Sequence, residues 1–303
     1  MRLRGFAAIG TTASMFGLGI VLAKLVSGVL NSFFFTFLCL AGGGILLALF
    51  LFVSRQPVFP ALPRTLWKDM LILTGFGTVL SLLIVLIGLA HTSAVIGGVL
   101  LQLEGPAAVF FAIPLLHERL SWRQALGSAI LLLGSILVVL QPEQPLAWQD
   151  SLLGILLVTT GAFIYGFALI PTKRLAVLAD SVQLSVLRLL LGAVCILPFL
   201  FFQPTLVFGP ISWPMIWILL IYIVTTYCIG YITQQLALRD LKVWEAAAVL
   251  QSTPLFTALS ALLITHETLT LLQIGGCLLV LIGGIFVVGR NTAAAEQVTS
   301  KLP

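Results

Sequence analysis

The sequence predicts an all-α integral membrane protein with ten transmembrane helices, arranged as two inverted five-helix repeats. Three observations support this fold class: the composition, a series of apolar runs, and a weak match of the chain to itself. Of the 303 residues, 60% are hydrophobic and only 8% are charged, and the mean hydropathy is +1.18. A soluble domain carries about 25% charged residues. This chain therefore cannot cover a surface that faces water.

Ten apolar stretches are each long enough to cross a bilayer as a helix, which requires about 20 residues. The first stretch follows a basic start, but no cleavage site of small residues closes it. We therefore expect a retained helix rather than a signal peptide. The expected spans are residues 5–24, 32–53, 67–89, 93–116, 122–140, 151–171, 184–203, 213–237, 244–265 and 271–289.

The basic residues between the spans indicate how the chain crosses the membrane. If both termini are cytoplasmic, every Lys and Arg except Lys24 and Arg188 falls on the cytoplasmic side or in the tail beside it. Short cytoplasmic loops carry an excess of Lys and Arg in membrane proteins. We therefore expect a multi-pass protein of the bacterial inner membrane with both termini cytoplasmic. This distribution also explains the net charge of +5, and we expect no nucleic-acid partner.

The chain matches itself when it is shifted by 149 residues. The strongest match aligns His-Glu-x-Leu at 117–120 with His-Glu-x-Leu at 266–269 (266 − 117 = 149), and Gln124 then aligns with Gln273. Because each copy contains five spans, an odd number, the two copies enter the membrane in opposite directions. Inverted repeats are typical of secondary transporters. The expected domains are a first five-helix repeat at 1–145, a second at 146–290 and a disordered cytoplasmic tail at 291–303.

The segments LHERLSWRQALG (116–127) and THETLTLLQIGG (265–276) occupy equivalent places in the two repeats. With the ten-span pattern, they make the chain resemble the EamA-type permeases of the drug/metabolite transporter superfamily, over nearly its whole length. The resemblance implies secondary transport, with export as the direction, but relatives carry diverse metabolites. Such permeases often have an arginine in the second helix of each half. Here Arg188 has Cys39 as its counterpart, so we expect no shared role in the first half.

Glu104 is an acid in the middle of an apolar stretch, and Gly105 and Pro106 follow it directly. An acid in lipid is costly unless it faces protein or water. Glu104 could bind a cationic or ammonium-bearing substrate, carry a proton, or serve as a neutral or paired structural acid. Pro106 and Pro254 each free a backbone carbonyl near the centre of matching spans. We favour broken helices that line a cavity over harmless kinks.

Further polar side chains are expected at membrane depth. Arg188 could pair with Glu104, extend to the headgroups or contact an anionic group of the substrate. Tyr227, Tyr231 and Gln234 follow i, i+4, i+7 spacing, so they share a helix face that must meet protein or water. The glutamines could instead form hydrogen bonds between helices. The predicted substrate-binding residues are Gln102, Glu104, Tyr165, Arg188, Tyr227, Tyr231, Gln234 and Gln251.

The sequence offers no recognisable chemistry for an enzyme. The His-Glu pairs lack the second histidine that a zinc-protease motif needs four residues later, because Ser121 and Thr270 occupy those positions. No Ser-His-Asp order, phosphate-binding loop or flavin signature occurs. We therefore expect no catalytic residues, no cofactor and no metal.

The sequence as a whole predicts a secondary transporter that exports small polar or amphiphilic metabolites, such as amino acids, by alternating access through a central cavity. One alternative is the efflux of cationic drug-like compounds. Another is an integral membrane enzyme or accessory protein without transport activity. The expected partners are a small-molecule substrate and the lipid bilayer, and a homodimer remains open.

Overall fold

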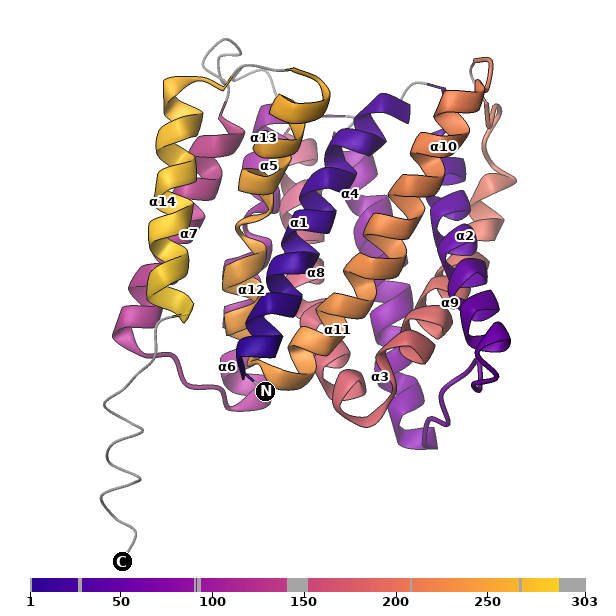
Figure 1. The fold of residues 1–303 in the computed structure, drawn as a ribbon, viewed down its shortest axis with the longest axis horizontal. Helices are drawn as coiled ribbons and strands as arrows, with labels where there is room; N and C mark the ends of the chain where they lie inside the picture. Colours follow the sequence, from indigo (N-terminus) through magenta and orange to yellow (C-terminus); the bar gives the residue numbers. More distant parts are fainter. Residues whose placement is uncertain are drawn as a thin grey trace, which may run out of the picture.

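The computed structural model describes residues 2–26, 29–89, 91, 94–140, 152–207, 209–266 and 269–288. Long helices stand side by side in this part of the chain and run alternately in opposite directions (Figure 1). Helix α1 (Arg2–Val26) begins and helix α14 (Leu271–Val288) ends at the same end of the molecule. We call this end the inner end and the opposite one the outer end. The tail expected at 291–303 lies outside the described residues.

The first half follows the five expected spans closely. Its third span combines several helical segments, one of which is π-helical, and its fourth span is interrupted. After α1, its elements are α2 (Ser32–Val53), the 3-10 helix η1 (Arg64–Leu66), α3 (Trp67–Leu71), the π-helix η2 (Ile72–Leu80), α4 (Ser81–Leu89), α5 (Ala94–Leu101), α6 (Glu104–Leu116) and α7 (Trp122–Val139).

The second half has the same order of elements. Its first helix continues seven residues beyond the expected end at 171, to Leu178. Its elements are α8 (Leu152–Leu178), α9 (Ser181–Leu200), α10 (Trp213–Tyr222), the π-helix η3 (Ile223–Gly230), α11 (Tyr231–Asp240), α12 (Val243–Leu250), α13 (Thr253–Ile264) and α14.

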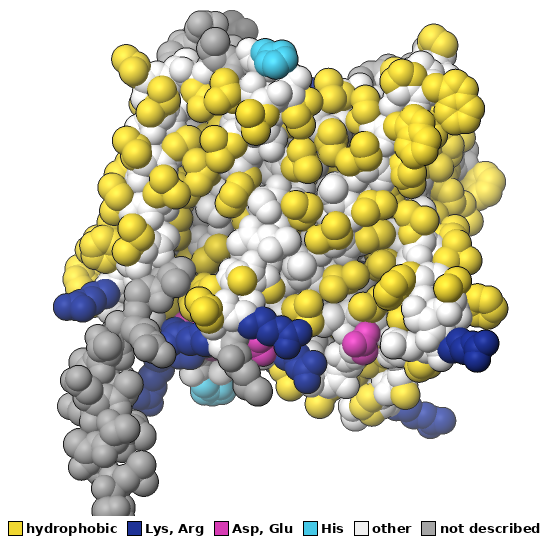
Figure 2. Space-filling view, in the orientation of Figure 1, with side chains coloured by type: hydrophobic (Ala, Val, Ile, Leu, Met, Phe, Trp, Pro, Cys, Tyr) yellow, Lys and Arg dark blue, Asp and Glu magenta, His cyan; other side chains and the backbone are white. Residues whose placement is uncertain are grey.

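The exterior has the character of a membrane protein. Within the described residues, nine helical stretches are long and apolar enough to cross a membrane, and Leu271–Val287 is a shorter apolar helix. Hydrophobic side chains cover the face drawn in Figure 2 between its two ends, whereas Lys and Arg side chains gather at the inner end. Exposed apolar groups such as Trp213 and Phe202 have a lower free energy in lipid than in water. The predicted all-helical, multi-pass fold is confirmed.

The histidine of each repeated His-Glu-x-Leu motif lies just after the end of a helix. His117 follows α6 and has a φ angle of 53°, and His266 follows α13 with a φ angle of 54°. Left-handed backbone of this kind commonly ends a helix. Each histidine thus marks the point where one membrane-spanning helix stops and the chain turns toward the next.

The glutamine of the same motif caps the helix that follows. The Ser121 side chain accepts a hydrogen bond from the Gln124 backbone N–H, and the Gln124 side chain accepts one from the Ser121 N–H at 3.1 Å. Thr270 and Gln273 form the same reciprocal pair at the start of α14, at 2.9 and 3.3 Å. Such a capping box satisfies N–H groups that have no partner within the helix. The repeat match between Gln124 and Gln273 is therefore explained by helix capping.

Helices α7 and α14 pack against each other through glycines. A Cβ atom at Gly134 would lie 2.8 Å from the carbonyl oxygen of Gly276, and one at Gly276 would lie 2.8 Å from that of Gly134. Gly127 and Gly283 face each other in the same reciprocal way. Small residues let membrane helices approach closely enough for their backbones to touch. The contact joins the last helix of one half to the last helix of the other.

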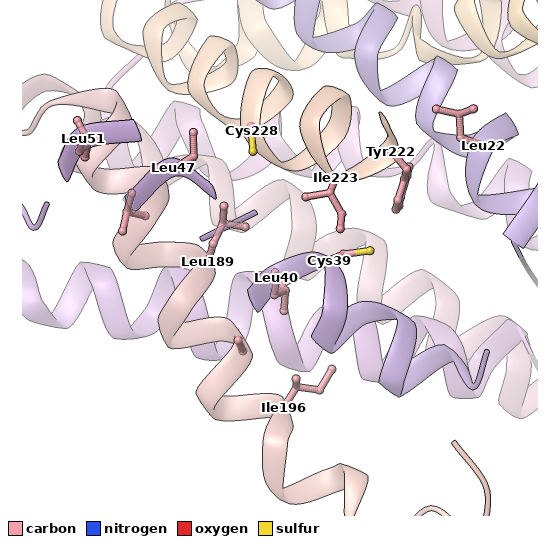
Figure 3. Close-up of a cluster of buried hydrophobic side chains, with 12 residues drawn as sticks. Leu22, Cys39, Leu40, Leu47, Leu51, Leu189, Ile196, Tyr222, Ile223 and Cys228 are labelled. Carbon is pink, nitrogen blue, oxygen red and sulfur yellow. The ribbon is translucent and has the colours of Figure 1, made fainter. Parts of the chain in front are cut away.

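A buried apolar cluster joins α2, α9 and η3 (Figure 3), and α2 and α9 stand at one side of the molecule in Figure 1. Leu40, Leu189 and Ile196 contribute to it, and each is at most 1% exposed. Cys39, the counterpart of Arg188, is fully buried in this cluster together with Tyr222. The cluster holds the second helices of the two halves against each other, because α2 and α9 are repeat counterparts.

Candidate substrate cavity

A cavity with a volume of about 1430 Å³ lies among residues of both halves. It extends from the middle of the helices to the outer end, where Ala261, His266 and Gln273 line it. Among the described residues, none from the last two turns of α6 or the first turn of α12 contributes to its wall. The cavity is therefore closed toward the inner end.

All eight predicted substrate-binding residues line this single cavity. They come from the break between α5 and α6, from α8, from α9, from η3 and α11, and from the break between α12 and α13. Pro254 also lines it, whereas Pro106 does not. The predicted residues in the cavity wall are Gln102, Glu104, Tyr165, Arg188, Tyr227, Tyr231, Gln234 and Gln251.

Two broken helices meet the cavity near its closed end. The fourth span is interrupted at residues 102–103, and the ninth span is interrupted at residues 251–252. Each interruption comes just before a proline, and Pro106 and Pro254 both lie in the first turn of the helix that follows. The first N–H groups of a helix have no partner within it, so a proline costs no hydrogen bond there.

Gln251 connects the two breaks. Its side chain is only 5% exposed and contacts Gly105, where any Cβ atom would overlap the amide group. Its backbone carbonyl accepts a hydrogen bond from the Ser135 hydroxyl of α7. The amide oxygen of its side chain has no partner within the described part of the chain. A buried acceptor without a partner beside a cavity can accept a hydrogen bond from a ligand.

Glu104 is the first residue of α6, and its carboxyl group lies beside the cavity. The first turn of a helix favours a negative charge, because its free N–H groups form the positive end of the helix dipole. Arg188 is the charged residue that acts on Glu104 most directly. The two side chains nevertheless form no ion pair in the part of the chain that the structure describes. Opposite charges thus share one cavity without neutralising each other by contact.

Arg188 is held in place by residues from both halves. Its Nε donates to Oγ1 of Thr78 at 3.1 Å, and its Nη1 donates to Oε1 of Gln234 at 3.4 Å. Its guanidinium carbon lies 4.3 Å from the centre of the Tyr231 ring, a favourable cation–π geometry. Arg188 is only 6% exposed. Its side chain therefore does not extend to the headgroups, and that alternative from the sequence is wrong. Its Nη2 makes no contact to an acceptor among the described residues.

Aromatic rings form one wall next to the guanidinium. The ring centres of Tyr227 and Tyr231 are 5.6 Å apart, those of Tyr222 and Tyr227 are 5.7 Å apart, and those of Phe16 and Tyr231 are 6.0 Å apart. Tyr222 and Thr226 also line the cavity but were missed from the sequence. The five-residue spacing from Tyr222 to Tyr227 fits a π-helix, and a search at α-helical spacing does not find it.

The charge in the cavity is unequal between the two halves. Arg188 lines the cavity, whereas its repeat counterpart Cys39 lies in the buried cluster of α2 and is absent from the wall. The repeat counterpart of Glu104 is Thr253, an uncharged residue that also lines the cavity. The negative group therefore comes from the first half and the positive group from the second.

Toward the inner end, the cavity stops at a plug of buried apolar side chains, to which α6, α11 and α12 contribute alanines. Ala108 and Ala112 of α6, Ala246 of α12 and Ala237 of α11 are all fully buried there. Ala247 belongs both to the plug and to the cavity wall. Ala247 therefore lies at the boundary between the plug and the cavity.

Charged side chains cluster beyond the plug at the inner surface, around a second cavity of about 800 Å³. The two carboxylate oxygens of Glu118 accept hydrogen bonds from the backbone N–H groups of Val243 at 2.9 Å and Trp244 at 3.2 Å. Glu245 pairs with Arg2. We call this group the inner cluster; its members are Arg2, Glu118, Arg119, Lys173, Asp240, Lys242 and Glu245.

Comparisons with known proteins agree with this architecture. Residues 3–140 and residues 152–289 each match the EamA-like transporter family. A solved structure described only as "Crystal structure of protein" is similar over 98% of this chain and 99% of that chain, with a TM-score of 0.82 and 18% identity. At that identity the similarity concerns the fold alone. Comparison with curated proteins gave no match. The two family matches cover most of the sequence, one in each half, and the chain therefore belongs to the EamA-like transporter family.

Proposed function

We propose that this protein is a secondary transporter that exports small polar metabolites, amino acids among them, by alternating access through the central cavity. We place it in the bacterial inner membrane with both termini cytoplasmic, so that the inner end faces the cytoplasm. Family membership supports transport, and the gathering of Lys and Arg at the inner end supports the orientation. Export is the direction that the family resemblance implies.

The presence of Glu104 and Arg188 in one cavity, without an ion pair between them, carries the proposal. A zwitterion brings an ammonium group for the acid and a carboxylate for the guanidinium. The Nη2 group of Arg188 remains available, and an arginine fork matches the planar geometry of a carboxylate. A substrate with both charges would therefore complete the hydrogen bonding of both residues at once.

The shape of the cavity supports alternating access. It reaches the outer end and stops at the plug on the inner side, as one state of a two-state carrier would. Inverted repeats allow the opposite state to form by rocking of the two halves around a fixed site. The gradient of the substrate, or of protons carried by Glu104, would supply the driving force.

Efflux of cationic amphiphilic compounds is a second candidate function. The cluster of Tyr222, Tyr227, Tyr231 and Phe16 favours it, because aromatic faces attract cations. Glu104 would act as the counter-charge. Arg188, buried in the same wall, disfavours a substrate that carries only positive charge.

Binding and transport by purified protein in liposomes test the proposal. A thermal-shift screen against amino acids, sugars, nucleosides and quaternary amines identifies the ligand class, and counterflow in liposomes then shows carrier transport. For an amino acid, we expect both Glu104→Gln and Arg188→Gln to weaken binding. Each change removes the charge on one side of a hydrogen bond to the substrate. Hydrogen bonds to charged groups are worth about 1.5–3 kcal/mol, so the upper limit of the expected loss is on the order of 100-fold in Kd.

A quaternary amine without a carboxylate separates the two candidate functions. If cationic compounds are the substrates, Glu104→Gln weakens binding and Arg188→Gln does not. Cys39→Ala serves as the matched control, since Cys39 is the repeat counterpart of Arg188 but lies outside the cavity wall. The zwitterion proposal fails if Arg188→Gln leaves amino-acid binding and counterflow unchanged.

A further inference from the structure

At the inner end, Glu118 of the first half bonds to two backbone N–H groups of the second half. We propose that its carboxylate is a latch that holds the start of α12 against the turn between α6 and α7, and so keeps the cavity closed to the inner side. This inference rests on the proposed alternating access. It makes Glu118 a positioning residue, which acts on the cavity through α12 without touching the substrate.

Glu118 caps the first two N–H groups of α12. The side chain before this helix belongs to Lys242, which has no acceptor to offer its first N–H groups. Glu118 accepts from the N–H groups of Val243 and Trp244 with both carboxylate oxygens. It does so from 125 and 126 residues away in the chain. Glu245 caps the Lys242 N–H from within the same half at 3.0 Å. The N–H groups of Val243 and Trp244, in contrast, are capped by a residue of the other half.

Two weaker contacts join the halves at the same place. Arg2 of α1 pairs with Glu245 in the first turn of α12 but is largely exposed, so solvent screens this pair. The Lys242 side chain donates to the carbonyl of Arg119 at 3.5 Å. Glu118 accepts two hydrogen bonds from buried backbone N–H groups, whereas each of the other contacts is single and comes from an exposed basic side chain. It should therefore dominate the strength of the connection.

The latch lies directly over the plug. Opening the cavity to the inner side requires α12 to separate from α6, because Ala246 and Ala247 pack there against Ala108 and Ala112. Contacts between alanines are small and non-directional. The bonds from Glu118 are directional and must break when α12 moves. The plug blocks the route from the cavity to the inner side. The latch determines how strongly α12 is held in this closed position.

Thiol labelling from the two sides measures this equilibrium without any substrate. In a background without native cysteines, Ala247→Cys reports on the plug from the inner side, and Ala261→Cys reports on the outer mouth. A membrane-impermeant maleimide is added to inverted or right-side-out vesicles. We expect Glu118→Ala to raise inner labelling at position 247 by about tenfold or more, and to lower outer labelling at 261, because loss of two charged hydrogen bonds corresponds to at least that factor.

Glu118→Gln is the second variant and guards against a folding defect. Its amide keeps one acceptor oxygen, so its effect should lie between those of the parent and Glu118→Ala. Asp180→Ala is the matched control, because Asp180 also caps a helix at the inner end, α9, but within its own half. The control should leave both labelling rates unchanged.

Two results would overturn the latch. Unchanged rates in Glu118→Ala would show that the carboxylate does not hold the inner end closed. Rates that rise together at positions 247 and 261 would indicate local unfolding rather than a change of access. Failure of the proposed substrate class would appear instead in the ligand screen, with labelling unaffected, so the two proposals are tested separately.

Discussion

At the scale of single residues, the pKa of the Glu118 carboxyl group is subject to opposing effects. Burial raises the pKa of its carboxyl group above the ordinary value of 4.5. The backbone N–H groups of Val243 and Trp244, and the positive charges of Lys173 and Lys242, act in the opposite direction without cancelling the effect of burial. The folded protein therefore holds a proton on this group more readily than the unfolded chain does.

This difference predicts how stability depends on pH. A group with a raised pKa in the folded state contributes stability below its unfolded pKa, and the contribution is lost as the pH rises through the folded pKa. The measured quantity is the melting temperature of the wild type minus that of Glu118→Gln. We expect this difference to decrease as the pH rises from 4.5 to neutral. Thermal unfolding in detergent at several pH values measures this. A constant difference, or one that increases with pH, would contradict the prediction.

The residues of the cavity differ in how well the sequence revealed them. Glu104 and Arg188 stood out because charges are rare in apolar spans, and the cavity contains both. The orientation of Arg188 could not be predicted, since its partners Thr78 and Gln234 are distant in sequence. The contact of Glu118 with Val243 is also a tertiary one. A motif shows that an acid is present but does not show which distant backbone it caps.

At the scale of helices, composition and proline placement gave most of the pattern. The expected end of the sixth span at residue 171 was too early, because Lys173 and Arg174 were taken to mark its end. In the structure they belong to the last two turns of α8. The π-helical segments could not be foreseen from hydrophobicity, since an apolar stretch reads alike in α- and π-helical form. Both breaks lie a few residues before their prolines rather than at them.

The contact between α7 and α14 gives a prediction for a single helix pair. A Cβ atom at Gly134 would lie 2.8 Å from the Gly276 carbonyl oxygen, whereas one at Gly275 would meet nothing within 4 Å. We expect Gly134→Ala to force the helices apart and destabilise the protein by roughly 1–3 kcal/mol. Gly275→Ala should leave stability unchanged or increase it slightly, since alanine favours the helix. Equal melting temperatures for the two variants would refute this packing.

At the scale of the whole molecule, the inverted repeat places equivalent motifs at opposite ends. His117 and His266 are repeat counterparts, both are exposed, and their φ angles differ by one degree, 53° and 54°. One follows α6 at the inner end, and the other lines the cavity at the outer end. The sequence predicted this relation from the odd number of spans alone. The state of the cavity, closed at one end, had no signal in the sequence.

The two histidines form a matched pair for testing orientation. With the native cysteines removed, we expect a membrane-impermeant maleimide to label His266→Cys in intact cells and to label His117→Cys only in inverted vesicles. The reason is that Lys and Arg gather at the inner end and should remain cytoplasmic. Labelling of both positions from one side would disprove the inverted arrangement. Labelling with the sides exchanged would reverse the orientation.

The two π-helical segments occupy nearly equivalent places in the two repeats. Shifted back by 149 residues, Ile223–Gly230 falls on positions 74–81, almost the same stretch as Ile72–Leu80. A π-helical turn is what an α-helix forms when it accommodates one extra residue. Both widened turns reach the cavity wall, through Gly77 of η2 and through Thr226 and Tyr227 of η3. The two halves therefore line the proposed substrate path with the same irregular backbone, although their side chains there differ.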